Sequence, residues 1–231
     1  NGSQLFKSED CTRTWAAIYQ IANSGQVIRT IALDPFAPNR VYIGQDSGEL
    51  LISEDSGTSW RVMQRFGSQL QRMAFDPQKE GLIYMATRKN GLLRSRDNGT
   101  TWDNVSDNMK EYTGALEYRR LYVYPGAPEN VYWISKYGVL VSRNAGQDWE
   151  PINLVPAPGS VSIYAFAVNP KNNKEIYLTA TASNRSVFYR STDGGQNWIS
   201  RKLPTTQVPT TLRIQPDTGA LYMGFAAATT N

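Results

Sequence analysis

The chain has 231 residues, of which 40% are hydrophobic and 19% charged, and its formal net charge is +4. It contains one cysteine, Cys11, and no histidine, which excludes an internal disulfide, a thiolate metal cluster, histidine metal sites and Ser-His-Asp or Cys-His catalysis. No stretch is long and apolar enough to span a bilayer, and no run of lysine and arginine indicates nucleic-acid binding.

Short apolar runs bounded by turn residues predict strands along the whole chain. Residues 1–20 carry two of them, and four longer units follow at about 26–64, 68–106, 115–154 and 160–203. Each longer unit has an apolar run ending in a proline, a run with a tyrosine, and a third run that leads into a polar motif. The prolines and tyrosines of these units are Pro35, Pro77, Pro125, Pro170, Tyr42, Tyr84, Tyr132 and Tyr177.

The polar motif is Ser-x-Asp-x-Gly-x-x-Trp, and it recurs at nearly even spacing. It reads SEDSGTSW from Ser53, SRDNGTTW from Ser95, SRNAGQDW from Ser142 and STDGGQNW from Ser191, with a worn copy, SEDCTRTW, from Ser8. The five tryptophans are 45, 42, 47 and 49 residues apart. A repeat of 40–50 residues has the length of one four-stranded propeller blade.

The residues of this motif are expected to hold a turn between the third and fourth strands. The Asp accepts main-chain N–H groups, the Gly supplies a positive φ, and the Trp packs between sheets. A calcium loop is excluded because its Asp-rich spacing and terminal Glu are missing, so no metal and no cofactor are expected. The structural residues are Asp10, Asp55, Gly57, Trp60, Asp97, Gly99, Trp102, Asn144, Gly146, Trp149, Asp193, Gly195 and Trp198.

The two ends of the chain complement each other. Residues 1–20 supply a third and a fourth strand, whereas residues 206–231 supply a first and a second, with Pro216 and Tyr222 at the repeat positions. Joining them makes a fifth blade and removes the exposed sheet edges. The prediction is an all-β, five-bladed β-propeller of four-stranded antiparallel blades in a single domain, 1–231.

The repeated motif resembles the Asp-box, or BNR repeat, over essentially the whole chain. The Asp-box superfamily includes sialidases, xyloglucan-degrading hydrolases, sortilin-type receptors and a lumenal photosystem II assembly factor. The cadence of this chain is most similar to the last three. The resemblance implies that the boxes lie on an outer, lower rim and that the working face is opposite. An extracytoplasmic location is also expected, either secreted, periplasmic or in the thylakoid lumen.

Basic residues gather at the expected working face, at the starts of the first strands and in the loops after the second strands. Arginine binds carboxylates through two parallel hydrogen bonds, so this face is predicted to bind an acidic or anionic protein, alone or in a larger or membrane-associated assembly. The alternative is a set of solvated charges on polar loops. The candidate residues are Arg29, Arg72, Arg119, Arg120, Tyr164, Arg88, Lys89 and Lys136.

Two other functions stay open beside a non-catalytic interaction module. Arg29, Arg72, Arg119 and Tyr164 correspond to half of a sialidase site. The acids near the expected working face are few (Asp46, Glu111, Glu117), and the Arg-Ile-Pro signature of sialidases is missing. A xyloglucanase would need paired acids in a long cleft. Carbohydrate binding without hydrolysis would use aromatic side chains, and the candidates are Tyr112, Tyr137 and Trp133. We expect no catalytic residue and no enzyme activity.

Overall fold

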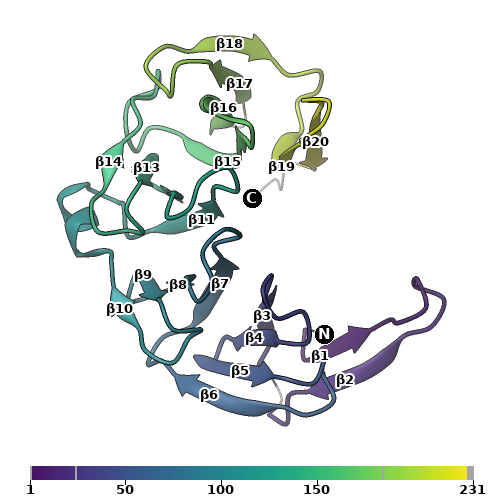
Figure 1. Ribbon diagram of the computed structural model, residues 1–231. Coiled ribbons are helices and arrows are strands. Elements are labelled where there is room, and N and C mark those ends of the chain that lie inside the picture. The colour runs from purple at the N-terminus through teal and green to yellow at the C-terminus, as the bar shows by residue number, and fades with distance from the viewer. Residues whose placement is uncertain (1, 24, 184, 228–231) are drawn as a thin grey trace. The chain divides into compact units, whose positions relative to one another are not determined.

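A computed structural model describes residues 2–23, 25–183 and 185–227. The chain divides into two compact units, unit 1 (Asn1–Ser106) and unit 2 (Asp107–Asn231), each of which is described by itself. Within the described residues the only helix is the short 3-10 helix η1 (Asp107–Glu111), and everything else is strand or loop (Figure 1). That helix is too short and too polar to cross a membrane.

Unit 1 contains one two-stranded and two four-stranded antiparallel sheets, in which the strands are neighbours in chain order. The two-stranded sheet consists of β1 (Gln4–Lys7) and β2 (Ala16–Gln20). The first four-stranded sheet consists of β3 (Ile28–Leu33), β4 (Val41–Gln45), β5 (Glu49–Ser53) and β6 (Arg61–Arg65). The second consists of β7 (Leu70–Phe75), β8 (Ile83–Thr87), β9 (Leu92–Ser95) and β10 (Asp103–Asn104).

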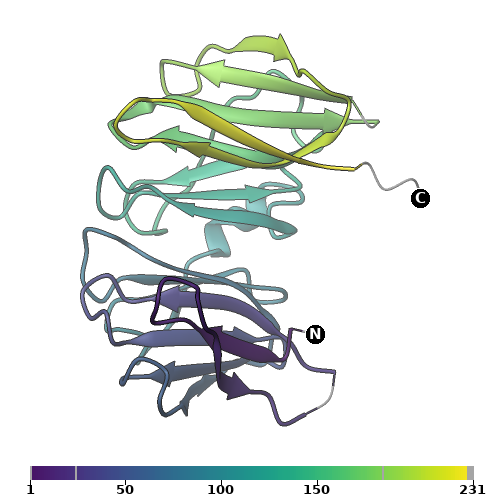
Figure 2. The same cartoon turned by 90° about the vertical axis from the view of Figure 1, so that its right-hand side faces the viewer.

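Unit 2 has two four-stranded sheets and a two-stranded sheet, and Figure 2 shows them stacked within the unit. The first sheet consists of β11 (Tyr118–Val123), β12 (Val131–Ser135), β13 (Val139–Ser142) and β14 (Glu150–Pro151). The second consists of β15 (Ser162–Asn169), β16 (Asn172–Ala182), β17 (Arg185–Ser191) and β18 (Ile199–Lys202). The last consists of β19 (Val208–Ile214) and β20 (Leu221–Ala226).

The core lies between the faces of successive sheets. β4, β8 and β12 are buried along their whole length, because each has a strand on either side and a sheet face to cover. In unit 1, Tyr42, Leu50, Met73 and Ile83 form part of one apolar cluster between the two complete sheets. Full burial of one such side chain contributes about 1.5–3 kcal/mol, so this packing between sheets is the main stabilising term of each unit.

The boxes close the turns between the third and fourth strands by a repeated set of hydrogen bonds. Ser53 Oγ accepts the N–H of Gly57 at 2.7 Å and donates to Asp55 Oδ1 at 2.8 Å. The carboxylate of Asp55 also accepts the N–H of Ser59 at 2.8 Å and its hydroxyl at 2.6 Å. Corresponding bonds are present at Asp97 and Asp193. Hydrogen bonds from the side chain at box position seven and from its N–H lower the pKa of Asp55 to about 2.

Two of the box tryptophans, Trp60 and Trp198, bind the preceding sheet as well as their own turn. The indole N–H of Trp60 donates to Ile18 O at 3.0 Å and Gly57 O at 3.1 Å. Trp198 makes the corresponding bonds to Asn153 O at 2.6 Å and Gly195 O at 3.2 Å. The motif therefore fixes a turn and also anchors one sheet to the sheet before it.

The sheets confirm the all-β propeller prediction: four complete four-stranded sheets and two half-sheets supply the strands of five blades. The half-sheets are β1–β2 in unit 1 and β19–β20 in unit 2, and their junction into one fifth blade stays a prediction. Tyr222 in β20 is 61% exposed, whereas its repeat equivalents are 0–7% exposed. Those equivalents are Tyr42, Tyr84, Tyr132 and Tyr177.

Candidate partner-binding face

Five strands, β3, β7, β11, β15 and β19, are the first strands of their repeats. Each has a β-bulge at the same repeat position, six residues before the repeat proline. In β3, for example, Ile28 pairs with Gln45 and Thr30 with Gly44, which leaves Arg29 as the extra residue. A bulge bends its strand and redirects a side chain, and such bulges are common beside binding sites. The extra residues are Arg29, Gln71, Arg119, Tyr164 and Thr210.

The structure corrects one sequence-based placement. Gln71 stands six residues before Pro77 and is the extra residue of β7, whereas Arg72 stands five residues before it and pairs with Ala86. Placing Arg72 level with Arg29 was therefore wrong by one residue. A strict count from the prolines gives Gln71, and the neighbouring arginine was the more conspicuous side chain.

Unit 1 brings four of the candidate cations to one end of two adjacent sheets. Thr30 Oγ1 accepts the N–H of Met73 at 3.0 Å, so the preceding residues, Arg29 and Arg72, lie at the same level of β3 and β7. The loop after β8 carries Arg88 and Lys89 to the same end. We call Arg29, Arg72, Arg88 and Lys89 the unit 1 basic patch.

The loops that carry this patch are held by hydrogen bonds of their own backbone. The N–H of Arg88 donates to Gln69 O and the N–H of Lys89 to Ser68 Oγ, both at 2.9 Å. Arg29 lies 3.9 Å from Asp46 Oδ2, and Asp46 Oδ1 also accepts the N–H of Val27. The remaining three cations of the patch are exposed, and within the described part of the chain they form no ion pair.

Unit 2 places the other candidates differently. Nη2 of Arg120 donates to Tyr164 O at 2.8 Å and to Thr210 O at 2.9 Å, so its guanidinium links three successive first strands. Lys136 forms an ion pair with Glu117 at 3.1 Å, and its N–H donates to Glu117 O. Arg119 is exposed, and the described residues include no acid paired with it.

The aromatic candidates divide into a core residue and a surface pair. Trp133 is fully buried, and its indole N–H donates to Ala115 O at 2.7 Å, so it is unavailable to stack on a sugar. Tyr112 and Tyr137 pack against each other with ring centroids 5.1 Å apart. Burial, followed by the negative charge of Glu111, raises the pKa of Tyr112, which also donates to Trp149 O at 3.3 Å.

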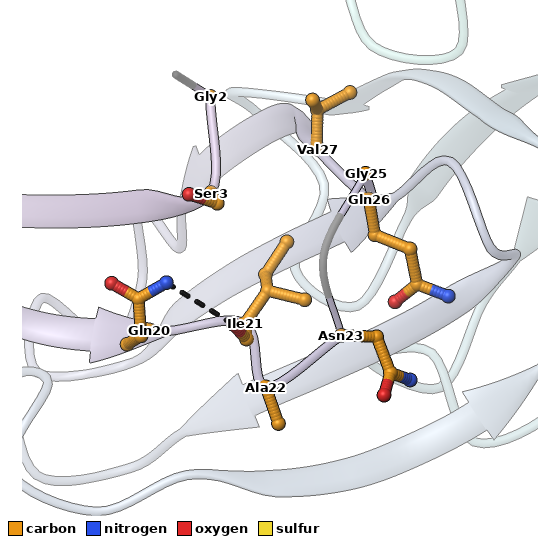
Figure 3. A pocket seen from close by; sticks show the side chains of 9 residues that line it. All are labelled: Gly2, Ser3, Gln20, Ile21, Ala22, Asn23, Gly25, Gln26 and Val27. Atoms are coloured by element: carbon orange, nitrogen blue, oxygen red, sulfur yellow. Dashed lines mark hydrogen bonds between the residues drawn. The ribbon is translucent and has the colours of Figure 1, made fainter.

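A cavity of about 410 Å³ in unit 1 was not foreseen from the sequence. It lies where the segment after β2 meets the N-terminal residues, and Gln20, Asn23 and Gln26 give it amide side chains (Figure 3). Gln20 Nε2 donates to Ile21 O at 3.1 Å. Among the described residues that line it, no side chain is charged, and three amides in the run QIANSGQV were the signal that could have indicated it.

Several of the candidate acids take part in local contacts. Of the carboxylates near the patch, Asp46 accepts the N–H of Val27 and lies beside Arg29, and Glu49 binds Arg65 at 2.9 Å. In unit 2, Glu117 binds Lys136. No group of three or more metal-ligating side chains occurs in residues 2–23, 25–183 and 185–227.

Repeated antiparallel sheets, in which a box turn joins the third strand to the fourth, define the chain as an Asp-box β-propeller. Residues 3–131, more than half of the chain, match the family model Sortilin-Vps10, described as sortilin, neurotensin receptor 3, and the chain belongs to this family. No curated protein matches the chain in sequence.

Solved structures share the fold at low sequence identity. An ancestral GH74 enzyme is 17% identical with a TM-score of 0.78, and the match covers 99% of this chain and 32% of that one. YCF48 from Cyanidioschyzon merolae is 18% identical with a TM-score of 0.62, over 89% and 68%. A chain of the nidogen/laminin complex is 16% identical with a TM-score of 0.59, over 91% and 76%. The chain spans about a third of the length of the GH74 enzyme, and these likenesses show the fold alone.

Proposed function

We propose that this chain is a non-catalytic propeller module that binds an acidic segment of another protein through the unit 1 basic patch. The observation that carries the proposal is the set of three exposed cations, Arg72, Arg88 and Lys89, that have no ion pair among the described residues and lie at one end of one unit. Holding like charges together without counter-charges is unfavourable, and an anionic partner would relieve this repulsion.

The arrangement suits a carboxylate-bearing partner. Arginine offers two parallel N–H groups to a carboxylate, and the patch contains three arginines and one lysine. The backbone bonds of Arg88 and Lys89 fix their loop before any partner arrives, which lowers the conformational entropy lost on binding. Among the similar folds is a chain of a nidogen/laminin complex, so the fold is compatible with binding another protein.

The test is a titration of a labelled peptide of alternating Glu and Gly against the wild type and a triple variant, Arg72→Gln, Arg88→Gln and Lys89→Gln. We expect the variant to bind about tenfold or more weakly, since charge-assisted hydrogen bonds contribute about 1.5–3 kcal/mol each. The matched control is Lys7→Gln, Arg61→Gln and Arg65→Gln, which removes the same charge from ion-paired positions of the same unit. Equal affinities of the two triple variants would overturn the proposal.

The non-catalytic part of the proposal has its own assay. The carboxylates of unit 1 nearest the patch, Asp46 and Glu49, are already bound to cations or to a backbone N–H group, so the patch itself offers no pair of free acids for glycoside hydrolysis. We expect no turnover of xyloglucan oligosaccharides or of a fluorogenic sialoside. Turnover that follows the protein through purification would show that the chain is a glycoside hydrolase.

An extracytoplasmic location is part of the proposal, and fractionation of the native cells would test it.

A further inference from the structure

The bulge of β11 in unit 2 is the strongest candidate for a second ligand contact. It is called here the β11 bulge site and consists of Arg119, Arg120, Tyr164 and Thr210. Three first strands meet there: Arg119 is the extra residue of β11, Tyr164 that of β15 and Thr210 that of β19. One nitrogen of Arg120 lies within 2.9 Å of the carbonyl oxygens of both Tyr164 and Thr210, so the three bulges converge on one guanidinium.

Arg120 changes the electrostatics of this place. Carbonyl oxygens at a bulge lie outside the regular ladder and would repel an approaching anion. The guanidinium of Arg120 offsets the negative charge of both oxygens, because it donates a charge-assisted hydrogen bond to each of them. The adjacent Arg119 is exposed and belongs to no ion pair of the described residues. Two arginines therefore lie at this place beside the two carbonyl oxygens.

Tyr164 adds a second donor. Its side chain is 39% exposed, and its backbone oxygen is held by Arg120, the neighbour of Arg119. Arg119 supplies N–H donors and Tyr164 an O–H donor, and donors of these two kinds suit a single carboxylate group.

We infer that the β11 bulge site binds one carboxylate of a peptide partner, with Arg119 and Tyr164 as the donors and Arg120 as the positioning residue. This inference rests on the proposed function, because it assigns to unit 2 a defined contact with the same acidic partner. It differs from the unit 1 basic patch in residues, in unit and in the number of carboxylates bound.

The experiment titrates the Glu-Gly peptide against five variants and the wild type. Arg119→Gln is expected to lower the affinity about tenfold and Tyr164→Phe about threefold. Arg201→Gln, an exposed arginine on the outer strand β18 of the same unit, is the matched control and is expected to leave the affinity within twofold. The positioning role is tested by Arg120→Met, which should lower the affinity, and by Arg120→Lys, which keeps the charge and should restore most of it.

The two proposals fail in distinguishable ways. If Arg119→Gln binds like the wild type while the triple variant of unit 1 is weakened, the β11 bulge site is wrong and the proposed function stands. If neither set weakens binding, both are wrong. The Arg119→Gln loss should also persist in the background of the unit 1 triple variant, since the two sites belong to different units. If Arg120→Met does not fold, the comparison of Arg119→Gln with Arg201→Gln still decides the inference.

Discussion

Ile18 packs directly against Gly57, so closely that a Cβ atom at Gly57 would lie 2.5 Å from Cδ1 of Ile18. Ile18 is the extra residue of a bulge in β2, and Gly57 has a φ of 96° in the box turn of the next sheet. The same relation recurs in unit 2, where a Cβ at Gly195 would lie 2.5 Å from Cγ2 of Ile152. The box glycine is therefore required for two reasons, its backbone conformation and the approach of the preceding sheet.

Gly57→Ala should destabilise the protein by about 1–3 kcal/mol, since alanine is strained at this φ and Ile18 has to turn away. Denaturant unfolding at pH 7 measures the change. Gly67→Ala is the control, because no atom lies within 4 Å of the new Cβ, and the free energy of unfolding is expected to be almost unchanged. A loss at Gly57 no larger than that at Gly67 would contradict the packing account.

Acid unfolding should depend on the box aspartates. The pKa values of Asp55, Asp97 and Asp193 are lowered to about 2 from an ordinary 3.8, mainly by hydrogen bonds from the residue at box position seven. A lowered folded-state pKa stabilises the fold at a pH above the unfolded value. That contribution is lost as the pH falls from about 4 to 2. The midpoint of urea unfolding should therefore be flat from pH 7 to 5 and then decrease.

The third box provides the control for this prediction. There Asn144 replaces the aspartate, and its Oδ1 still accepts the N–H of Asp148 at 3.0 Å. Asn at the corresponding position of the other boxes should keep the turn and remove the titrating group. A variant with Asp55→Asn, Asp97→Asn and Asp193→Asn is expected to show a shallower acid decrease than the wild type. An identical pH profile would show that the acid transition has another origin.

The worn first box offers a stabilising substitution. Thr12 stands where the intact boxes have glycine, and its φ is 73°, a conformation that strains a β-branched residue. Its N–H already donates to Ser8 Oγ at 2.8 Å, as in the intact turns. Thr12→Gly should stabilise the protein by about 0.5–2 kcal/mol. Thermal unfolding measures the change, with the reciprocal Gly146→Thr expected to destabilise. A lower melting temperature for Thr12→Gly would contradict the assignment.

The repeat period and the box chemistry made most of the fold predictable from the sequence. Each box turn depends on bonds among residues within four positions of one another, such as Ser53 with Gly57, and local bonds of this kind leave a recurring sequence pattern. The strands between boxes follow from their apolar runs and turn residues. The order of strands within each sheet then follows from short antiparallel connections.

The arrangement of the candidate face was less predictable. Gln71 and Arg72 were interchanged because the count back from Pro77 was one residue short, and the bulge that makes Gln71 the extra residue of β7 is visible only in the strand pairing. Side-chain pairing between distant residues also had no sign in the sequence: Arg120 bonds to an oxygen 90 residues away, and Lys136 pairs with Glu117, 19 residues away. Such contacts depend on three-dimensional placement, so a count of charges overestimated the number of free cations.

The junction of the two half-sheets has a direct chemical test. In all four complete sheets the residue before the repeat tyrosine pairs with the box serine, as Val41 does with Ser53. The sequence thus predicts that Tyr222 pairs with Lys7. In a Cys11→Ser background, Lys7→Cys with Tyr222→Cys should form an intramolecular disulfide under mild oxidation. Lys7→Cys with Leu221→Cys is the control, because adjacent strand residues point to opposite faces. Equal cross-linking of both pairs would contradict this register.

The charge of the unit 1 basic patch can be reversed while most of its loop contacts are kept, because Arg88 and Lys89 are held through backbone groups. The most direct test of the proposed function compares a Glu-Gly peptide and a Lys-Gly peptide with the wild type and with Arg72→Glu, Arg88→Glu and Lys89→Glu combined. The wild type should prefer the Glu peptide, and the reversed protein should lose that binding and prefer the Lys peptide. The same preference in both proteins would contradict the account.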